Sequence, residues 1–218
     1  MSATITGVAF DLDGTLYTLR GMRRHMTVAL WRSLGVLRHL SKARAAIRPR
    51  DFEDGDALRH AFLGELGRRA GVGPERASAW YEDEFLPAFV QTLARRGRRR
   101  PHVLGLLARL RMAGVRLAVV SDYPVVTERL RAVGIPIEAF HALSSAEESG
   151  ALKPSPRALL RMAQRWGLDP AAMLVVGDRE DLDGDAARKA GMDYLDVRIG
   201  WDTAMDVIAT RTGTGVST

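Results

Sequence analysis

The chain has 218 residues, 46% of them hydrophobic, and carries a formal net charge of +6. This size and composition predict a globular protein with a sizeable core, built as one large domain or as a core domain with a smaller one inserted. The absence of cysteine excludes disulfides, thiolate nucleophiles and cysteine-ligated zinc. Because no segment resembles a signal peptide or a membrane span, we expect a cytoplasmic protein without a membrane partner.

The first predicted element is a buried strand over 5–10, and the stretch that follows it has a different character. From 17 to 98 there is no convincing strand, but helical patterns occur near 20–40, 55–71 and 74–96. The aromatic residues of this stretch are expected to form a core of its own: Trp31, Trp80, Tyr81 and Phe85.

After residue 98, short apolar runs alternate with helical patterns. Strands are predicted at 115–120, 140–143, 173–176 and 194–199. Helices are predicted at 101–113, 124–133, 155–167 and 182–190. Such alternation is typical of a parallel sheet with helices on both faces. We therefore predict an α/β fold, with a Rossmann-like three-layer core formed by 1–16 and 99–218 and an all-helical insert at 17–98.

The positive charge is concentrated in the insert, where 16 Lys and Arg stand against 9 Asp and Glu, whereas the rest of the chain has 16 and 17. The simplest interpretation is a solvated, arginine-rich surface, and a sharper one is a surface that attracts anionic substrates. The arginine-rich run at 95–100 raises nucleic acid as a third interpretation. Because no aromatic residues interleave with it to stack on bases, we expect no nucleic-acid partner.

Two carboxylates follow the first strand directly. Asp11 and Asp13 are two residues apart, so in an extended chain their side chains face one site. Neighbouring carboxylates repel each other unless a cation or a shared proton intervenes, and Mg²⁺ suits a site made of carboxylates and phosphate. Gly14 allows a sharp turn after them, and Thr15 follows it.

Two further signals come later in the chain. Ser121 and Asp122 follow the strand at 115–120, where a hydroxyl before a helix can bind phosphate together with free backbone N–H groups. Lys153 is one of only three lysines, against 29 arginines, which suggests that a compact ammonium is needed at its position. Alone, each signal also fits a helix cap or a chance loop residue.

A second group of acids follows the strand at 173–176. Asp178 stands at the strand end and is the best-placed third metal ligand, while Asp183 could hold a metal-bound water or orient Lys153. Asp181 and Asp185 fit a simpler role as acids at a helix start. All of these signals fall at the carboxyl edge of the predicted sheet, which is where open α/β sheets bind ligands.

These four signals, in this order, resemble the motifs of the haloacid dehalogenase superfamily, in particular its phosphatase branches with a helical cap. The resemblance spans residues 5–191 and is most specific in its first motif, which includes Asp11, and its fourth, which includes Asp178. It implies that Asp11 is the nucleophile and a metal ligand. It also implies that Asp13 is the general acid and base and binds the metal through its backbone carbonyl.

The same resemblance implies that Ser121, Asp122 and Lys153 bind the phosphoryl group and that Asp178 completes a Mg²⁺ site, with Gly14, Thr15 and Asp183 in support. The expected activity is hydrolysis of small phosphomonoesters through an aspartyl phosphate. A cap over the site would exclude macromolecules and restrict the partner to a small phosphorylated metabolite. Arginines near its hinge would favour a second negative group on that substrate: Arg20, Arg23 and Arg24.

Other activities of the superfamily are weighed on the same motifs. Dehalogenating members lack an acid at the position of Asp13, and phosphonate-cleaving members need a cap lysine and lack the second Asp. Sugar phosphomutases share all four motifs and stay an alternative. A non-catalytic binding module, from a different class, is disfavoured because the set of motif residues is intact. The substrate, the pathway and the choice between monomer and dimer stay open.

Overall fold

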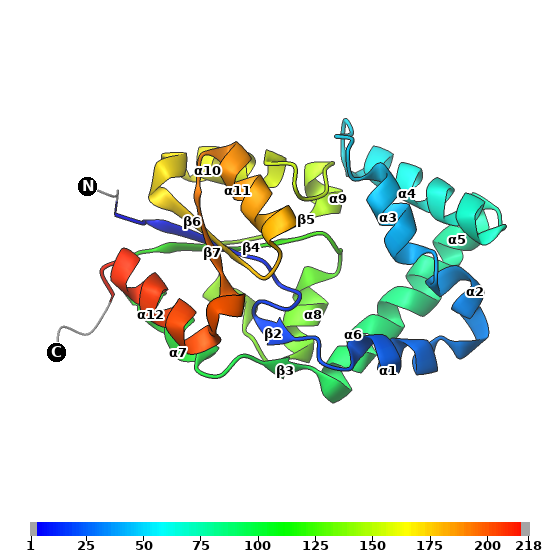
Figure 1. The fold of residues 1–218 in the computed structure, drawn as a ribbon, viewed down its shortest axis with the longest axis horizontal. Helices are drawn as coiled ribbons and strands as arrows, with labels where there is room; N and C mark the ends of the chain where they lie inside the picture. Colours follow the sequence, from blue (N-terminus) through cyan, green and yellow to red (C-terminus); the bar gives the residue numbers. More distant parts are fainter. Residues whose placement is uncertain (1–3, 215–218) are drawn as a thin grey trace.

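The computed structural model describes residues 4–214 and contains a five-stranded parallel sheet in the order β5-β4-β1-β6-β7 (Figure 1). The strands are β1 (Gly7–Phe10), β4 (Arg116–Ser121), β5 (Ala142–Ser145), β6 (Met173–Gly177) and β7 (Asp193–Asp196). In register, Phe10 lies between Val119 and Val176. The predicted α/β core is confirmed. The strands predicted at 140–143 and 194–199 differ in extent: β5 begins two residues later than expected, and residues 197–199 form a 3-10 turn instead of extending β7.

Alternation along the central strand explains why the sheet is buried on both faces. Val8 and Phe10 pack into one apolar cluster with Leu117 of β4, whereas Ala9 packs into a second cluster with Ala118. Successive side chains of a strand point to opposite faces, so both faces here require apolar residues. This is why the strands read as continuous apolar runs in the sequence.

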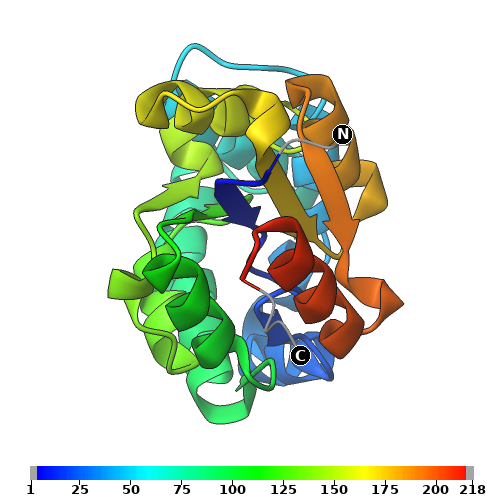
Figure 2. The ribbon, with the colours of Figure 1, turned by 90° about the vertical axis from the view of Figure 1, so that its left-hand side faces the viewer.

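Helices cover both faces of the sheet (Figure 2). On one face lie α10 (Arg157–Trp166) and α11 (Asp185–Ala190), which supply Leu159 and Ala186 to the second cluster. On the other lie α7 (Val103–Met112), α8 (Val126–Ala132) and α12 (Trp201–Arg211). The short α9 (Ala146–Ser149) follows β5. Helix α12 was not predicted. The left-handed Gly114 and Gly191 follow α7 and α11 and allow the chain to turn there.

The insert is helical and lies at one end of the sheet (Figure 1). Its helices are α1 (Met22–Ala29), α2 (Leu34–Leu37), α3 (Leu40–Ile47), α4 (Gly55–Ala70), α5 (Pro74–Ala79) and α6 (Leu86–Arg96), with the π-helical turn η2 (Trp80–Phe85). The expected helix near 20–40 is in fact broken into shorter pieces. Of the expected aromatic core, Trp80, Tyr81 and Phe85 are buried, but the prediction for Trp31 is wrong, because it is 64% exposed.

Two short strands join the insert to the sheet. β2 (Tyr17–Thr18) and β3 (Arg98–Arg99) pair antiparallel, with Tyr17 opposite Arg99. The next residue, Arg100, donates hydrogen bonds from its guanidinium to the backbone oxygens of Gly14 (2.6 Å) and Thr15 (3.2 Å). The two connections of the insert therefore meet beside the loop that follows β1, and one arginine of the basic run at 95–100 supports that loop.

A second contact joins the insert to the sheet domain through residues 51–55. The backbone N–H of Phe52 donates to Gly150 O at 2.9 Å, and Ser155 Oγ donates to Asp51 Oδ2 at 3.1 Å. At the start of α4, a Cβ added to Gly55 would overlap the backbone carbonyl of Glu147 in α9. The close approach of these two backbones therefore requires glycine at position 55.

We expect Gly55→Ala to weaken this contact and to lower the free energy of unfolding by about 1–3 kcal/mol, because neither backbone can yield without a shift of the helix. Gly64→Ala on the same helix is the matched control, since a Cβ there meets nothing within 4 Å. It should be neutral or stabilising by up to about 1 kcal/mol. Denaturant unfolding measures the free energy of unfolding of both variants. Equal values for the two would contradict a close backbone contact at Gly55.

Candidate active site

The carboxyl ends of three adjacent strands bring the predicted residues to one place. Asp11 follows β1, Ser121 ends β4 and Asp178 follows β6, and β1 lies between the other two strands. A cavity of about 280 Å³ opens there. Its lining includes six predicted site residues and four residues of the insert: Asp11, Asp13, Asp122, Lys153, Asp178 and Asp183, with Leu19, Ser41, Arg44 and Arg48. Ser121 is buried and is not among the lining residues.

Lys153 is the central cation of the site. Its Nζ donates to Asp11 Oδ1 at 2.5 Å, to Asp183 Oδ1 at 2.6 Å and to the backbone oxygen of Val120 at 3.3 Å. All three donor positions of the ammonium are thus used, and Lys153, Asp11 and Asp183 are buried. The other oxygen of Asp11, Oδ2, accepts from Thr15 Oγ1 at 3.0 Å. Asp183 thus contacts the ammonium of Lys153, and its role in orienting that group stays a prediction.

Two glycines make room for the carboxylates. Gly14 has φ +89°, and a Cβ there would overlap Asp178 Oδ2. Gly177, the last residue of β6, would likewise overlap the carboxylate of Asp183 if it carried a Cβ. Gly14 therefore does more than turn the chain, since its missing side chain also lets Asp178 approach the loop after β1.

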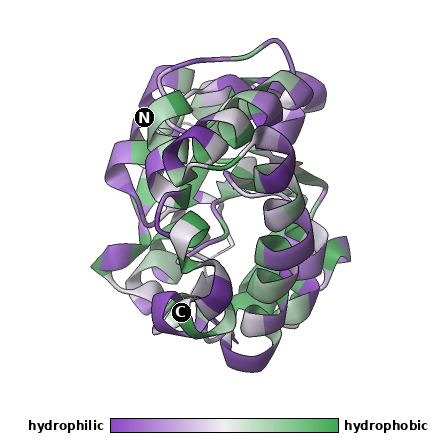
Figure 3. Cartoon of the chain, turned by 90° about the vertical axis from the view of Figure 1, so that its right-hand side faces the viewer, coloured by the Kyte–Doolittle hydropathy of each residue, from purple (hydrophilic) through white to green (hydrophobic). Residues whose placement is uncertain are grey.

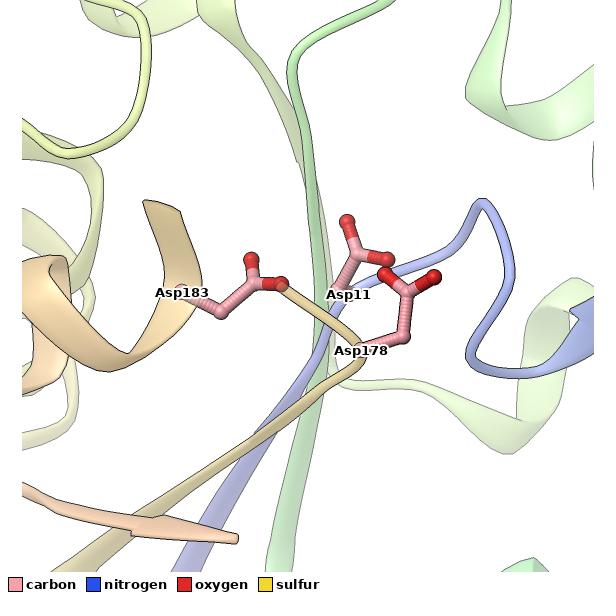
Figure 4. A group of neighbouring side chains, drawn as sticks. All are labelled: Asp11, Asp178 and Asp183. Carbon is pink, nitrogen blue, oxygen red and sulfur yellow. The ribbon is translucent and has the colours of Figure 1, made fainter. Parts of the chain in front are cut away.

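Asp11, Asp178 and Asp183 form an acidic cluster that fits a metal ion (Figure 4). One carboxylate oxygen from each residue lies within 4.8 Å of the others. Oxygen donors of this kind suit Mg²⁺ rather than softer metals. Three carboxylates stand against the single ammonium of Lys153, so a bound divalent cation would balance the remaining negative charge.

The side chain of Asp13 turns to a different set of partners. Tyr17 Oη donates to Asp13 Oδ1, and Arg129 Nη2 donates to Asp13 Oδ2. Arg129, from α8, is fully buried, and its Nη1 also donates to Ser121 Oγ at 3.0 Å. One buried arginine thus links two predicted site residues. The sequence analysis missed both Arg129 and Tyr17, because neither stands in a motif.

Asp122 connects the core to the insert. Its Oδ1 accepts from the backbone N–H of Lys153 at 2.9 Å, and its Oδ2 pairs with Arg48 Nη1 at 2.9 Å. Its backbone oxygen accepts from Arg44 Nη1 at 2.7 Å. The carboxylate offers no donor to phosphate, so the predicted phosphate-binding role of Asp122 stays a prediction that only its backbone N–H could fulfil. Arg44, from α3, and Arg48, which directly follows that helix, were not predicted from the sequence either.

Comparisons with known proteins agree with this geometry. A family model described as "haloacid dehalogenase-like hydrolase" matches residues 5–191. The chain belongs to this family. It is 30% identical to a glyceraldehyde 3-phosphate phosphatase from Methanopyrus kandleri, over 90% of the chain and 85% of that protein. It is 28% identical to a phosphoglycolate phosphatase from Escherichia coli, over 91% of the chain and 83% of that protein.

Solved structures show the same fold for this hydrolase. A predicted phosphoglycolate phosphatase from Haemophilus somnus superposes with a TM-score of 0.58 at 24% identity, covering 89% of this chain and 85% of that one. A 2-haloacid dehalogenase from Pseudomonas syringae gives 0.57 at 24% identity, covering 87% and 85%. Within residues 4–214, no helix is both long and apolar enough to cross a membrane.

Burial sets the ionisation of the acids in the hydrolase. It raises the pKa of Asp11 to about 7, an effect that Lys153 opposes and that Asp183 and Asp13 reinforce. Burial and the neighbouring Asp183 also raise the pKa of Asp178. Protons are therefore held more tightly in the folded than in the unfolded chain. Without metal, the stabilisation that comes from this tighter proton binding is fully present below about pH 4. It is lost as the pH rises through the folded pKa of Asp11, about 7.

Protons and a divalent cation compete for these carboxylates, so Mg²⁺ should stabilise the protein more at high pH. We expect saturating Mg²⁺ to raise the melting temperature by about 5 °C at pH 8 and by much less at pH 5. Asp178→Asn should remove most of this increase. Asp185→Asn, which changes an exposed acid paired with Arg188, should keep it. Equal Mg²⁺ effects at both pH values in the wild type would contradict the acidic cluster as the metal site.

Proposed function

We propose that this hydrolase is a Mg²⁺-dependent phosphatase that cleaves small phosphomonoesters through a phosphate ester on Asp11. The observation that carries the proposal is the buried contact of Asp11 with Lys153 and Thr15 inside the acidic cluster. Each oxygen of the Asp11 carboxylate accepts a hydrogen bond, which fixes the position of this carboxylate at the edge of the sheet. The phosphatase names of the two relatives favour the same chemistry.

The proposed reaction has two steps, the transfer of the phosphoryl group to Asp11 and its hydrolysis. A carboxylate oxygen of Asp11 forms a bond to phosphorus while the bond from phosphorus to the leaving alkoxide breaks, and Asp13 gives that alkoxide a proton. Asp13 then takes a proton from water, the water oxygen bonds to phosphorus, and the bond to Asp11 breaks. The products are an alcohol and inorganic phosphate, and both aspartates return to their initial state.

The other residues hold the reacting groups. Lys153 would bind the phosphoryl oxygens, and Asp11, Asp178 and the backbone carbonyl of Asp13 would hold Mg²⁺, with Asp183 in the same cluster. Ser121 does not line the cavity, so its predicted contact with phosphate would require its hydroxyl to reach the phosphoryl group from beneath the cavity wall. When bound, Mg²⁺ would neutralise negative charge on the phosphoryl group. Arg44 is a buried cation that helps to line the same cavity, and its positive charge favours an anion as the occupant.

We further propose that residues 17–98 act as a cap whose hinge is the β2–β3 pair. β2 directly follows the loop after β1 and pairs with β3 at the other end of the insert, and the insert contributes Leu19, Ser41, Arg44 and Arg48 to the cavity wall. A substrate bound beneath these residues is separated from bulk water, which strengthens the electrostatic interactions inside. This placement supports small substrates over phosphoproteins or nucleic-acid ends.

The decisive experiment is a free-phosphate assay with Mg²⁺ over a panel of small phosphate esters. We expect phosphate release by the wild type and its loss by at least about three orders of magnitude in Asp11→Asn, which keeps the shape of the side chain but removes the nucleophile. Asp185→Asn serves as the control and should keep full activity. If Asp11→Asn retained a substantial rate, the covalent step would be wrong. Isomerised ester without free phosphate would indicate a phosphomutase.

Arg129 tests the role of Asp13, because it contacts Asp13 and Ser121 and does not line the cavity. We expect Arg129→Met to lower kcat by about ten- to a hundredfold, with little change in KM, since it removes a group that positions the proposed acid and base. Loss of the buried cation should also destabilise the fold by about 3–5 kcal/mol. Arg131→Met, an exposed change on the same helix, is the control. A folded Arg129→Met variant with wild-type kcat would separate Arg129 from catalysis.

A further inference from the structure

A second, larger cavity adjoins the catalytic one inside the insert. Its volume is about 790 Å³, and it lies among residues of α1, α2, α3, α6 and η2. Four residues line both cavities: Asp13, Leu19, Ser41 and Tyr123. The larger cavity, called the cap cavity below, therefore begins where the catalytic cavity ends.

The walls of the cap cavity are mainly apolar. Methionine, leucine and phenylalanine side chains supply most of the lining, among them Met22, Met26, Leu34, Leu37 and Phe89. In Figure 3, which shows the end of the molecule that carries the insert, hydrophobic segments alternate with hydrophilic ones along these helices. A cavity of this size is in the range of about 300–1,000 Å³ that binds organic ligands, and apolar walls favour an apolar occupant.

The position of Asp13 identifies which part of a substrate would enter the cap cavity. The phosphoryl group belongs at Asp11 and Lys153, which line only the catalytic cavity. Asp13, the proposed proton donor to the leaving alkoxide, lines both. The leaving oxygen must lie next to its proton donor, so the group attached to that oxygen extends toward the cap cavity.

We propose that the cap cavity binds the leaving group of the substrate, and that this group is an apolar alkyl or aryl chain. The inference rests on the proposed phosphatase function and names the substrate class of the same site. A substrate such as a short acidic ester would occupy only the catalytic cavity and leave the apolar walls in contact with water. An apolar alcohol moiety would instead remove those walls from water and gain binding free energy with each methylene.

The charges around the cavities agree with an apolar leaving group. Of the three arginines expected to select a second negative group, Arg23 lines the cap cavity, whereas Arg20 and Arg24 line neither cavity. Arg44 and Arg48 face the catalytic cavity and already donate to Asp122. Arg38 is the second arginine in the lining of the cap cavity, and both arginines stand beside a larger number of leucine, methionine and phenylalanine side chains.

The test is a series of n-alkyl phosphates, from ethyl to octyl, assayed for free phosphate with Mg²⁺. We expect kcat/KM to rise about three- to fourfold per methylene until the chain fills the cap cavity. Phosphoglycolate, which is short and acidic, should be hydrolysed no faster than ethyl phosphate. A flat or falling series, with the short esters still hydrolysed, would overturn the apolar subsite and leave the phosphatase function standing.

Variants of the cavity wall sharpen the test. Leu34→Lys places a charge in the cap cavity, and Leu160→Lys on α10 is its matched control, because the two leucines are 39% and 41% exposed. Leu34→Lys should abolish the rise of kcat/KM with chain length, because a charged side chain in the cap cavity opposes entry of an apolar chain. Leu160→Lys should keep the full dependence. Retention of the chain-length effect in Leu34→Lys would overturn the assignment of this cavity.

A binding measurement separates the two proposals if no ester is turned over. Calorimetry with octylphosphonate and methylphosphonate, neither of which is an ester, should show tighter binding of the longer chain and a negative heat-capacity change in the wild type. Equal affinities would overturn the subsite independently of catalysis. A change of oligomeric state in Leu34→Lys, seen by size-exclusion chromatography without a change in chain-length dependence, would instead make this face a contact between copies and would also overturn the proposal.

Discussion

The structure depends on how it neutralises buried charge at the end of β1. Asp11 is buried, and its pKa is raised to about 7 because burial disfavours its charged form. Lys153 supplies one positive charge to Asp11 and Asp183 together, at 2.5 and 2.6 Å. A compact ammonium can contact both acids and a backbone oxygen at once, whereas a planar guanidinium would need more space. This requirement explains a lysine at position 153 in a chain that otherwise uses arginine.

Two further constraints follow from that cluster. The acids can converge only because β1 lies between β4 and β6, so that three strand ends open at one edge. They can approach closely only because Gly14 and Gly177 carry no side chain where Asp178 and Asp183 lie. The sheet order therefore brings acids from distant parts of the chain to one edge, and the two glycines leave the few ångströms of space that their carboxylates need.

Sequence patterns predicted the features that local chemistry specifies. Apolar runs at 5–10 and 173–176 marked strands buried on both faces, and acids directly after them marked the site. Contacts formed only by the tertiary fold left no such pattern. Arg129 and Arg44 are buried and donate hydrogen bonds to Asp13 and Asp122. Nothing in the sequence distinguishes these two from the other 27 of the 29 arginines. The cap cavity was also missed, because apolar residues on short helices read equally as core.

The connection between the insert and the catalytic residues is short enough to couple them physically. Tyr17 is the first residue of β2, through which the insert leaves the core, and it donates a hydrogen bond to Asp13. Arg129, which holds the other oxygen of Asp13, packs its guanidinium 5.2 Å from the ring of Phe89 in α6. Tyr17 thus belongs to the proposed hinge, and Arg129 contacts the insert. Both groups that orient the Asp13 carboxylate are therefore connected to the insert.

This arrangement gives a reason for the position of Asp13 at the junction of the two cavities. If the insert rotated about the proposed hinge, Phe89 would move relative to the sheet, and with it the contact to the Arg129 guanidinium that holds Asp13. The side chains of Asp11 and Lys153, by contrast, are held by Thr15, Asp183 and Val120, all of which lie outside the insert, although Arg48 of the insert donates to the backbone oxygen of Lys153. The side chain of Asp11, the proposed nucleophile, is therefore held from the sheet domain, while that of Asp13, the proposed proton donor, is held by groups at the insert. In the proposed mechanism, the geometry of proton transfer would thus depend on the occupant of the cap cavity more than the attack on phosphorus would.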